Sequence, residues 1–477
     1  MTLVRKRWRA QELLELVLDE GSWESWDRPI DVSDHPADYL AELQAAAAKA
    51  GTDESVLTGR GRVRGRPVAV VVNEFAFLAG SIGRAAAGRI EAAVRRATAE
   101  GLPLLASTSS GGTRMQEGTP AFVEMVEITR AITAHRAAGL PYLVQLRHPT
   151  TGGVFASWGS LGHVTVAEPG AMIGFLGPKV YEALEGKPFP EGVQQAENLA
   201  AKGVIDAVVA VEELPDLLDQ ALRVLTDPPE PSVLPRRGAA ALETGDAWAS
   251  IERTRSTDRA GVRDLLRHGG SDTLRLSGTD EGERDETVIL ALTRLDGQPC
   301  VLVGQDRTRQ HGGQAMGPAA LREARRGMEL AEELRLPLVT VIDTPGAELS
   351  PHAEERAVAG EIARCIATMT TLTVPSCAVL LGQGCGGGAL ALLPAQTVIA
   401  AQHAWLSPLP PEGASVIVHR DVDHAPQMAA RQHVRAVDLA ANGAVHKVVP
   451  EHEDDDVASL SRAIAAEVSA QLVRMRR

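Results

Sequence analysis

One pattern, a β-rich run followed by a helix, a second strand and a glycine turn, occurs twice along this chain and constrains its fold more than any other feature. In the first half, residues 65–68 open the β-rich run, and residues 101–113 end in Ser-Ser-Gly-Gly-Thr. In the second half, residues 296–300 open the run, and residues 336–347 end in Asp-Thr-Pro-Gly-Ala. Because the order is the same, we infer that one fold is used twice.

The correspondence extends to a second glycine turn in each half. The first half reads Thr-Gly-Gly-Val at residues 151–154, and the second reads Gly-Cys-Gly-Gly-Gly at residues 384–388. Residues 227–235 contain four prolines, which sustain neither a helix nor a strand ladder. The predicted fold class is therefore α/β, with two domains that are each built from βαβ-type units. The expected boundaries are 1–226 for the first domain, 227–240 for a proline-rich linker and 241–477 for the second domain.

Local patterns predict individual elements of the first domain. Apolar residues at helical spacing predict an amphipathic helix over residues 9–19. β-rich runs and glycine or proline stops predict the elements that follow. These are a strand at 68–72, a helix at 84–99, a strand at 103–107, a helix at 121–138, a strand at 142–146, and then a glycine turn and another helix.

The composition excludes several classes of protein. The chain has 477 residues and a formal net charge of −14, which opposes a general role on nucleic acid or on an anionic membrane. The apolar stretch 374–401 is interrupted by Gln383, a glycine cluster and Pro394, so it does not predict a membrane span. The N-terminus shows no export signal. Four cysteines without a CxxC pair predict neither a zinc ribbon nor a disulfide framework, which favours a soluble cytoplasmic protein. They are Cys300, Cys365, Cys377 and Cys385.

The glycine turns are the candidate sites. A strand that ends in Gly-Gly before a helix presents backbone N–H groups, and without a Cβ a ligand oxygen can approach them closely. If that oxygen belongs to a thioester, the same donors stabilise the enolate that forms when its α-carbon becomes nucleophilic. The alternative is that these glycines only allow helices to pack closely on strands. Four turns in paired positions favour a functional role.

Other motifs point to weaker hypotheses. Residues 382–387 fit GxGxxG, but the acidic residue expected about 20 positions later is missing, which disfavours a dinucleotide site. No P-loop and no GxSxG elbow occur, and Cys385 has no neighbouring positive charge that would activate it as a nucleophile. Arg114 can pair with Glu117 or reach a phosphate, and His311 can line a site or lie exposed on a loop. The acidic run 451–456 is interpreted as a solvated connection.

Taken in order, the motifs resemble the carboxyltransferase component of bacterial acetyl-CoA carboxylase, with its β and α subunits fused in that order. The resemblance covers nearly the whole chain. In the β-like half it rests on residues 18–23, 58–68, 75–83, 110–118 and 167–175. In the α-like half it rests on residues 294–299, 342–347, 353–356 and 386–391.

The resemblance implies a crotonase-like (ClpP/crotonase) fold of repeated β-β-α units for both halves. It also implies active sites formed between a β-type and an α-type domain. It implies an enzyme that moves a carboxyl group from carboxybiotin on a separate carrier protein to the α-carbon of a small, acetyl-CoA-like acyl-CoA. Gly152 and Gly153 would hold the acyl enolate, and Gly384 and Cys385 would be their counterparts for biotin. The predicted substrate-binding residues are Gly111, Gly112, Arg114, Gly346, Ala347, Gly386 and Gly387.

The same resemblance implies partners and leaves alternatives. A biotin carboxyl carrier protein and a biotin carboxylase are expected partners, with at least a homodimer and with no bound metal, nucleic acid or membrane. The chain departs from the family pattern in lacking a four-cysteine zinc ribbon, in carrying Cys385 for a glycine, and in the lengths of 305–317 and 407–413. Biotin-independent decarboxylation of a malonyl-type thioester and a catalytically altered scaffold subunit remain open.

Overall fold

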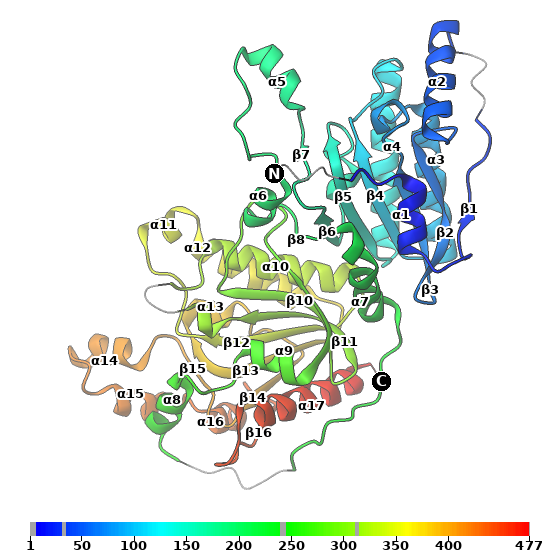
Figure 1. Cartoon of the computed structure of the whole chain (residues 1–477). Coiled ribbons are helices and arrows are strands. Elements are labelled where there is room, and N and C mark those ends of the chain that lie inside the picture. Colours follow the sequence, from blue (N-terminus) through cyan, green and yellow to red (C-terminus); the bar gives the residue numbers. More distant parts are fainter. Residues whose placement is uncertain (1–5, 31–34, 239–244, 311–313, 477) are drawn as a thin grey trace. The chain divides into compact units, whose positions relative to one another are not determined.

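The computed structural model describes residues 6–30, 35–238, 245–310 and 314–476 (Figure 1). The chain forms two compact units. The first comprises Met1–Leu222 with Asp280–Gly282, and the second comprises Arg223–Thr279 with Glu283–Arg477. Each unit contains one eight-stranded sheet, and none of the helices in these described ranges is both long and apolar enough to cross a membrane.

The sheet of the first unit has the order β1-β2-β3-β4-β5-β6-β8, and β7 pairs with β5. Strands β1 to β3 are antiparallel, and the pairs from β3 to β8 are parallel. The strands are β1 (Glu24–Ser25), β2 (Val56–Val63), β3 (Arg66–Asn73), β4 (Leu104–Ser110), β5 (Tyr142–Thr151), β6 (Val164–Ala167), β7 (Ile173–Gly174) and β8 (Ala207–Val208). The helices are α1 (Ala10–Val17), α2 (Ala37–Ala50), α3 (Arg84–Glu100), α4 (Gly118–Ala137), α5 (Pro178–Glu185), α6 (Ala196–Ala201) and α7 (Leu214–Thr226).

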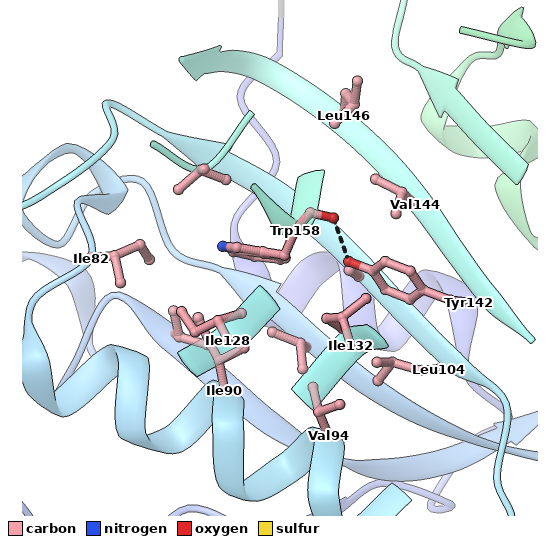
Figure 2. Packing of buried hydrophobic residues seen from close by; sticks show 14 of the residues in the cluster. Ile82, Ile90, Val94, Leu104, Ile128, Ile132, Tyr142, Val144, Leu146 and Trp158 are labelled. Atoms are coloured by element: carbon pink, nitrogen blue, oxygen red, sulfur yellow. Dashed lines mark hydrogen bonds between the residues drawn. The ribbon is translucent and has the colours of Figure 1, made fainter. Parts of the chain in front are cut away.

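The core of the first unit lies where α3 and α4 pack on the parallel strands (Figure 2). Ile90 and Val94 of α3 and Ile128 and Ile132 of α4 are buried because they recur at helical spacing on one side of each helix. Among the aromatic side chains of this core, the Tyr142 hydroxyl donates a 2.8 Å hydrogen bond to the Trp158 carbonyl oxygen.

The sheet of the second unit has the order β16-β14-β13-β12-β11-β10-β9, and β15 pairs with β13. The strands are β9 (Gly270–Leu276), β10 (Val288–Leu295), β11 (Gln298–Gln305), β12 (Leu338–Thr344), β13 (Ser376–Cys385), β14 (Thr397–Ala401), β15 (Trp405–Ser407) and β16 (Lys447–Val449). The helices are α8 (Ala247–Arg255), α9 (Val262–Gly269), α10 (Pro318–Glu333), α11 (Pro351–Glu355), α12 (Val358–Thr371), α13 (Gly386–Leu390), α14 (Pro411–His419), α15 (Ala425–Arg431), α16 (Ala436–Ala441) and α17 (Val457–Met475).

The two units repeat one another down to strand register. Strands β4 and β12 have seven residues each, and β5 and β13 have ten each. Leu104 pairs with Tyr142 in the first unit, and Leu338 pairs with Ser376 in the second. Both pairs of strands also contain a register shift just before their last bridge. The repeat inferred from the sequence is therefore a repeat of structure.

The predicted elements of the first half occur, with one exception. The helix over 9–19 is α1, and the strands and helices from residue 68 to residue 146 are β3, α3, β4, α4 and β5. The helix expected after the second glycine turn is absent, because the chain forms turns and a short 3₁₀ helix at Trp158–Ser160. The Gly159 N–H donates to the Val154 carbonyl oxygen five residues earlier at 2.9 Å, in place of the i→i−4 bond of a regular α-helix.

The proline-rich segment is held along the β10–β11 hairpin. Arg294 donates a 3.1 Å hydrogen bond to the Pro228 carbonyl oxygen, and Gln298 donates a 2.7 Å bond to that of Glu230. The Asp296 carboxylate accepts hydrogen bonds from the Val233 and Leu234 N–H groups. Residues 239 and 240 of the predicted linker lie outside the described residues. The predicted domain boundaries stay a prediction.

Candidate active site

Two glycine turns meet at one edge of the first sheet, because β4 and β5 are neighbouring parallel strands. Gly112 has a φ of +102°, and a Cβ on it would lie 3.3 Å from the Gly152 Cα. Gly152 has a φ of +63°, which is also the left-handed region that favours glycine. The two turns therefore approach each other by backbone alone, and a side chain at either position would separate them.

The backbone N–H groups of these turns are not equally available. The Gly112 N–H donates to the Ser110 Oγ at 3.0 Å, and the Gly152 N–H donates to the Phe175 carbonyl oxygen at 3.0 Å. Neither the Gly153 N–H nor the Thr113 N–H donates a hydrogen bond to another described residue. Their positions are close, since the Thr113 Oγ1 would lie 3.1 Å from a Cβ on Gly153. These two N–H groups are the donors that a ligand oxygen can use.

Sequence reasoning identified Gly153 but missed Thr113. Every residue except proline has a backbone N–H, so the residue types in the turn could not identify the Thr113 N–H as a donor. The signal is geometric, because Thr113 forms an isolated parallel bridge with Ile82. In that bridge the Ile82 N–H donates to the Gly112 carbonyl oxygen and the Arg114 N–H donates to the Ile82 carbonyl oxygen, which leaves the intervening Thr113 N–H unused.

The second unit has the same arrangement, with φ of +139° at Gly346 and +61° at Gly386. The shared register makes Gly386 and Gly387 the counterparts of Gly152 and Gly153. The predicted pair, Gly384 and Cys385, comprises the last two residues of β13, where they pair with Leu406 and Ser407 of β15. Both pairs are among the predicted site residues, and the backbone favours the later pair as donors.

Ala347 is the counterpart of Thr113, because it forms the equivalent parallel bridge with Met316. A Cβ on Gly388 would lie 3.2 Å from the Ala347 nitrogen, so the two turns of this unit also meet by backbone. The Gly346 N–H donates to the Thr344 Oγ1 at 3.1 Å, as the Gly112 N–H donates to Ser110. The Gly387 N–H lies in the first turn of α13, where no intrahelical acceptor exists. Ala347 and Gly387 thus offer the equivalent pair of donors.

Cys385 is a packing residue of the second unit. Its side chain is buried in a hydrophobic cluster with Ile251 of α8, Trp405 of β15 and Val434. Burial raises the pKa of the Cys385 thiol to about 12, so the nucleophilic thiolate is not formed near neutral pH. The sulfur therefore fills a small apolar space beside the turn.

Arg114 lies beneath the first turn with its guanidinium enclosed by protein. It forms a buried ion pair with Glu54, a 3.3 Å ion pair with Glu117 and a hydrogen bond to the Ser81 carbonyl oxygen at 2.8 Å. The Glu117 carboxylate in turn accepts the Arg84 N–H at the start of α3 at 2.7 Å. Burial opposes ionisation of Glu117, but the hydrogen bonds from Arg84 and Tyr39 lower its pKa overall. These contacts hold the turn, and a contact of Arg114 with substrate stays a prediction.

Two further sequence hypotheses have separate outcomes. His311 lies outside the described residues. The acidic run at 451–456 is not uniformly solvated, because Glu451 is buried against Arg259 and Asp455 pairs with Arg237. Among the described residues, no group of three or more His, Cys, Asp or Glu side chains is arranged to hold a metal ion.

Comparisons with known proteins agree with this architecture. The model of the carboxyl transferase domain family matches residues 9–476. A Mycobacterium tuberculosis protein described as a probable biotin-dependent acyl-coenzyme A carboxylase β3 subunit is 59% identical over 468 residues, which cover 96% of this chain and 94% of that protein. The acetyl-coenzyme A carboxylase carboxyl transferase subunits β/α of Salinispora arenicola are 36% identical, covering 92% of this chain and 83% of that protein.

A solved structure shows the same fold. The crystal structure of transcarboxylase 12S matches with a TM-score of 0.77 and 20% sequence identity, over 98% of this chain and 90% of that chain. This likeness confirms the predicted α/β, crotonase-like fold class. The family match and the two relatives confirm the resemblance that the motifs predicted. The chain belongs to the carboxyl transferase family, and it is a carboxyltransferase enzyme with the crotonase-like fold.

Proposed function

We propose that this chain is the carboxyltransferase subunit of a biotin-dependent acyl-CoA carboxylase. Biotin, attached to a carrier protein, supplies the activated carboxyl group. The bond between the ureido nitrogen of biotin and the carboxyl carbon would break, and that nitrogen would take up the proton lost from the α-carbon of the acyl thioester. The α-carbon would then form the new bond to the carboxyl carbon. The observation that carries this proposal is the pair of unused N–H groups in each unit, at turns that approach each other through glycine backbone.

In this proposal, each of the two pairs of donors binds the oxygen of a different reactant. The N–H groups of Thr113 and Gly153 hold the negative charge that develops on the thioester oxygen. Those of Ala347 and Gly387 hold the ureido oxygen of biotin. Backbone donors fixed at strand ends need no reorganisation when charge develops, which is why they are effective in such reactions. The proposal requires no side-chain nucleophile, in agreement with the inert thiol of Cys385.

We propose a small, acetyl-CoA-like acyl group as the acceptor. The support is the resemblance of the motifs to acetyl-CoA carboxylase and the 36% identity with the Salinispora protein of that name. The name of the Mycobacterium relative leaves the acyl group open. The cytoplasm is the proposed location, because the four cysteines, which are all buried, are unpaired.

The proposed partners are a biotin carboxyl carrier protein, a biotin carboxylase and at least one further copy of this chain. Large apolar side chains near the glycine turns are exposed. Exposed apolar surface is typical of sites where another protein binds, so these side chains support an assembly. Met115 is 74% exposed in the first unit, and Leu349, at the corresponding position of the second, is 93% exposed. Phe122 and Phe175 add to the exposed apolar surface of the first unit.

The test is carboxyl transfer with purified protein. Malonyl-CoA or methylmalonyl-CoA is mixed with free biotin or a biotinylated carrier, and the acyl-CoA products are followed by mass spectrometry in both directions. We expect biotin-dependent loss of the carboxyl group, reduced about 100-fold or more in Gly153→Leu. The Cβ alone would lie 3.1 Å from the Thr113 Oγ1, so the larger side chain would displace the turn that carries the Thr113 N–H. Gly88→Ala, an open helical position on α3, is the control.

Biotin-independent loss would contradict this proposal and indicate a decarboxylase. An absence of turnover with every thioester would instead indicate a non-catalytic subunit.

A further inference from the structure

A buried carboxylate, that of Asp343, lies near the glycine turns of the second unit. It is not part of the donor pair proposed above. Asp343, at the end of β12, is fully buried. Its Oδ1 accepts a 3.0 Å hydrogen bond from the Gln383 N–H in β13, three residues before Gly386. The register of β12 and β13 shifts between Ile342 and Thr344. At this irregularity the Asp343 side chain, in place of a backbone carbonyl, accepts the hydrogen bond of the Gln383 N–H.

Gly382 supplies the space for this carboxylate. A Cβ at Gly382 would lie 2.4 Å from the Asp343 Oδ1 and 2.7 Å from its Cγ, so no other residue fits without displacing the acid. At the corresponding positions of the first unit, the sizes of the two side chains are reversed. There, a small Ser109 faces the larger His148, and the Ser109 hydroxyl donates to the His148 carbonyl oxygen at 3.0 Å. The Asp-Gly pair is therefore particular to the second unit.

Gln305, at the end of β11, links the end of β12 to α13. Its Oε1 accepts the Asp343 N–H at 3.0 Å, and its Nε2 donates to the Gly388 carbonyl oxygen at 2.8 Å. The ladder between β11 and β12 ends at Gly304 and Val341, so the side chain of Gln305 satisfies backbone groups beyond the last bridge. Gly388 faces the Ala347 nitrogen, which would lie 3.2 Å from a Cβ built on Gly388. One buried amide thus sets the spacing between the turn after β12 and the turn after β13.

Arg307 supplies the opposite charge. Its Nη1 lies 3.6 Å from the Asp343 Oδ2, and neither of these two buried atoms has a hydrogen-bond partner among the described residues. The same guanidinium is fixed by its Nη2, which donates to the carbonyl oxygens of Thr254 at 2.9 Å and Ser256 at 2.7 Å. Asp343 therefore sits in a rigid setting, where removal of its carboxylate cannot be compensated by water from outside.

We propose that Asp343 and Gln305 are positioning residues for the donor turns of the second unit. Both side chains are fully buried, so their effect would pass through the backbone that they hold. They fix the distance between the N–H groups of Ala347 and Gly387 through Gln383 and Gly388. This inference rests on the proposed function and deepens it, because it assigns these residues to the half of the reaction that involves biotin. A donor displaced by a fraction of an ångström loses most of its effect on developing charge.

The experiment compares Asp343→Ala, Asp343→Asn and Gln305→Met with Ser376→Ala. Ser376 is the control, because it is buried at the start of the neighbouring strand β13, far from Gln383, and its Oγ accepts the Gln396 N–H at 3.0 Å. We expect kcat/KM for biotin to fall about 10- to 100-fold in Asp343→Ala and Gln305→Met. The KM for acyl-CoA should stay within about twofold. Asp343→Asn should recover part of the loss, because its amide oxygen can still accept from Gln383.

Amide hydrogen exchange supplies a readout that does not depend on turnover. Asp343→Ala and Gln305→Met should exchange faster than Ser376→Ala over residues 383–390, and this increase should exceed any change over residues 457–475 of the same unit. Equal exchange, or kinetics no worse than those of Ser376→Ala, would overturn the positioning role. So would an equal change in the KM for acyl-CoA and in that for biotin. A wild-type protein without biotin-dependent turnover would refute the proposed function, while hydrogen exchange would still decide the positioning role.

Discussion

At the scale of single residues, the conformations of a few glycines decide whether the donors of the site can form. We predict that Gly112→Ala lowers kcat/KM about 100-fold, because its Cβ would press on the Gly152 Cα at 3.3 Å and its φ of +102° disfavours a side chain. Gly88→Ala provides the comparison, since a Cβ there meets nothing within 4 Å. Steady-state kinetics and thermal melting of both variants measure the effect. A Gly112→Ala enzyme with wild-type kinetics would show that the close approach is dispensable.

His135 gives the first unit a pH-dependent stability. Its ring is buried in α4, with Nδ1 3.0 Å from the Thr98 Oγ1 and Nε2 3.2 Å from the Pro141 carbonyl oxygen. Burial lowers its pKa to about 4, although the Pro141 carbonyl opposes the change. An unfolded histidine titrates near 6.5, so between these values the unfolded state binds the extra proton. Stability contributed by the neutral ring is therefore present above about pH 6.5 and is lost as the pH falls toward 4.

We predict that His135→Gln flattens this dependence. Between pH 7 and pH 4.5 the wild type should lose on the order of 1–3 kcal/mol more unfolding free energy than the variant. Urea denaturation at several pH values measures the difference, and the exposed His452→Gln serves as the control. If the wild type and His135→Gln have parallel pH profiles, the buried ring does not carry the effect.

At the scale of elements, the sequence predicted what local chemistry determines. Gly101 ends α3 in the left-handed conformation with a φ of +66°, and Gly139 precedes β5 with a φ of +81°. Because glycines such as these mark where helices end, the succession of β3, α3, β4, α4 and β5 could be predicted from the amino-acid sequence. The exact end of β13 was not predictable, because a run of glycines does not show which of them still pairs in the sheet. For this reason Gly386 and Gly387 emerge as counterparts of Gly152 and Gly153 only from strand register.

Long-range pairs were equally hidden from the sequence. Glu451, predicted to be solvated, follows β16 and forms two 2.7 Å hydrogen bonds with Arg259, which precedes α9. Both side chains are almost fully buried. Burial opposes the charge on Glu451, but its bonds to Arg259 lower its pKa overall. Nothing in the acidic run indicated a partner so far away along the chain.

We predict that Glu451→Gln destabilises the second unit by about 3–5 kcal/mol, because it leaves the buried Arg259 charge without a counter-ion. The exposed neighbour Glu453→Gln should change the unfolding free energy by less than about 0.5 kcal/mol. Chemical denaturation followed by circular dichroism measures both variants. Equal stability of the two would show that water reaches Arg259 and replaces the lost carboxylate.

At the scale of the whole molecule, the chain is two copies of one architecture that have diverged in their supports. In the first unit, ion pairs of Arg114 with Glu54 and Glu117 lie beside the turn. In the second unit, hydrogen bonds of Asp343 and Gln305 occupy the region near the turns. The backbone donors themselves have the same register in both units. Divergence around a constant backbone fits two donor sites that hold different groups, which is what transfer between an acyl thioester and biotin requires.

The proposed assembly makes a prediction that separates sites built within one chain from sites shared between copies. If a site combines the first unit of one copy with the second unit of another, two inactive variants can restore each other. Gly153→Leu disables the first unit, and Gly387→Leu disables the second. In a mixed dimer, one site would contain both substitutions and the other would contain neither.

Co-expression with two different affinity tags, followed by purification on both, isolates the mixed assembly. We expect about half of the wild-type activity in a mixed dimer, against almost none for either variant alone. The control is a mixed dimer of two differently tagged Gly153→Leu chains, which contains no intact first unit and should stay inactive. If the Gly153→Leu and Gly387→Leu pair also stays inactive while each variant retains its wild-type melting temperature, each site must lie within a single chain. Assembly would then serve stability or partner binding and not the chemistry.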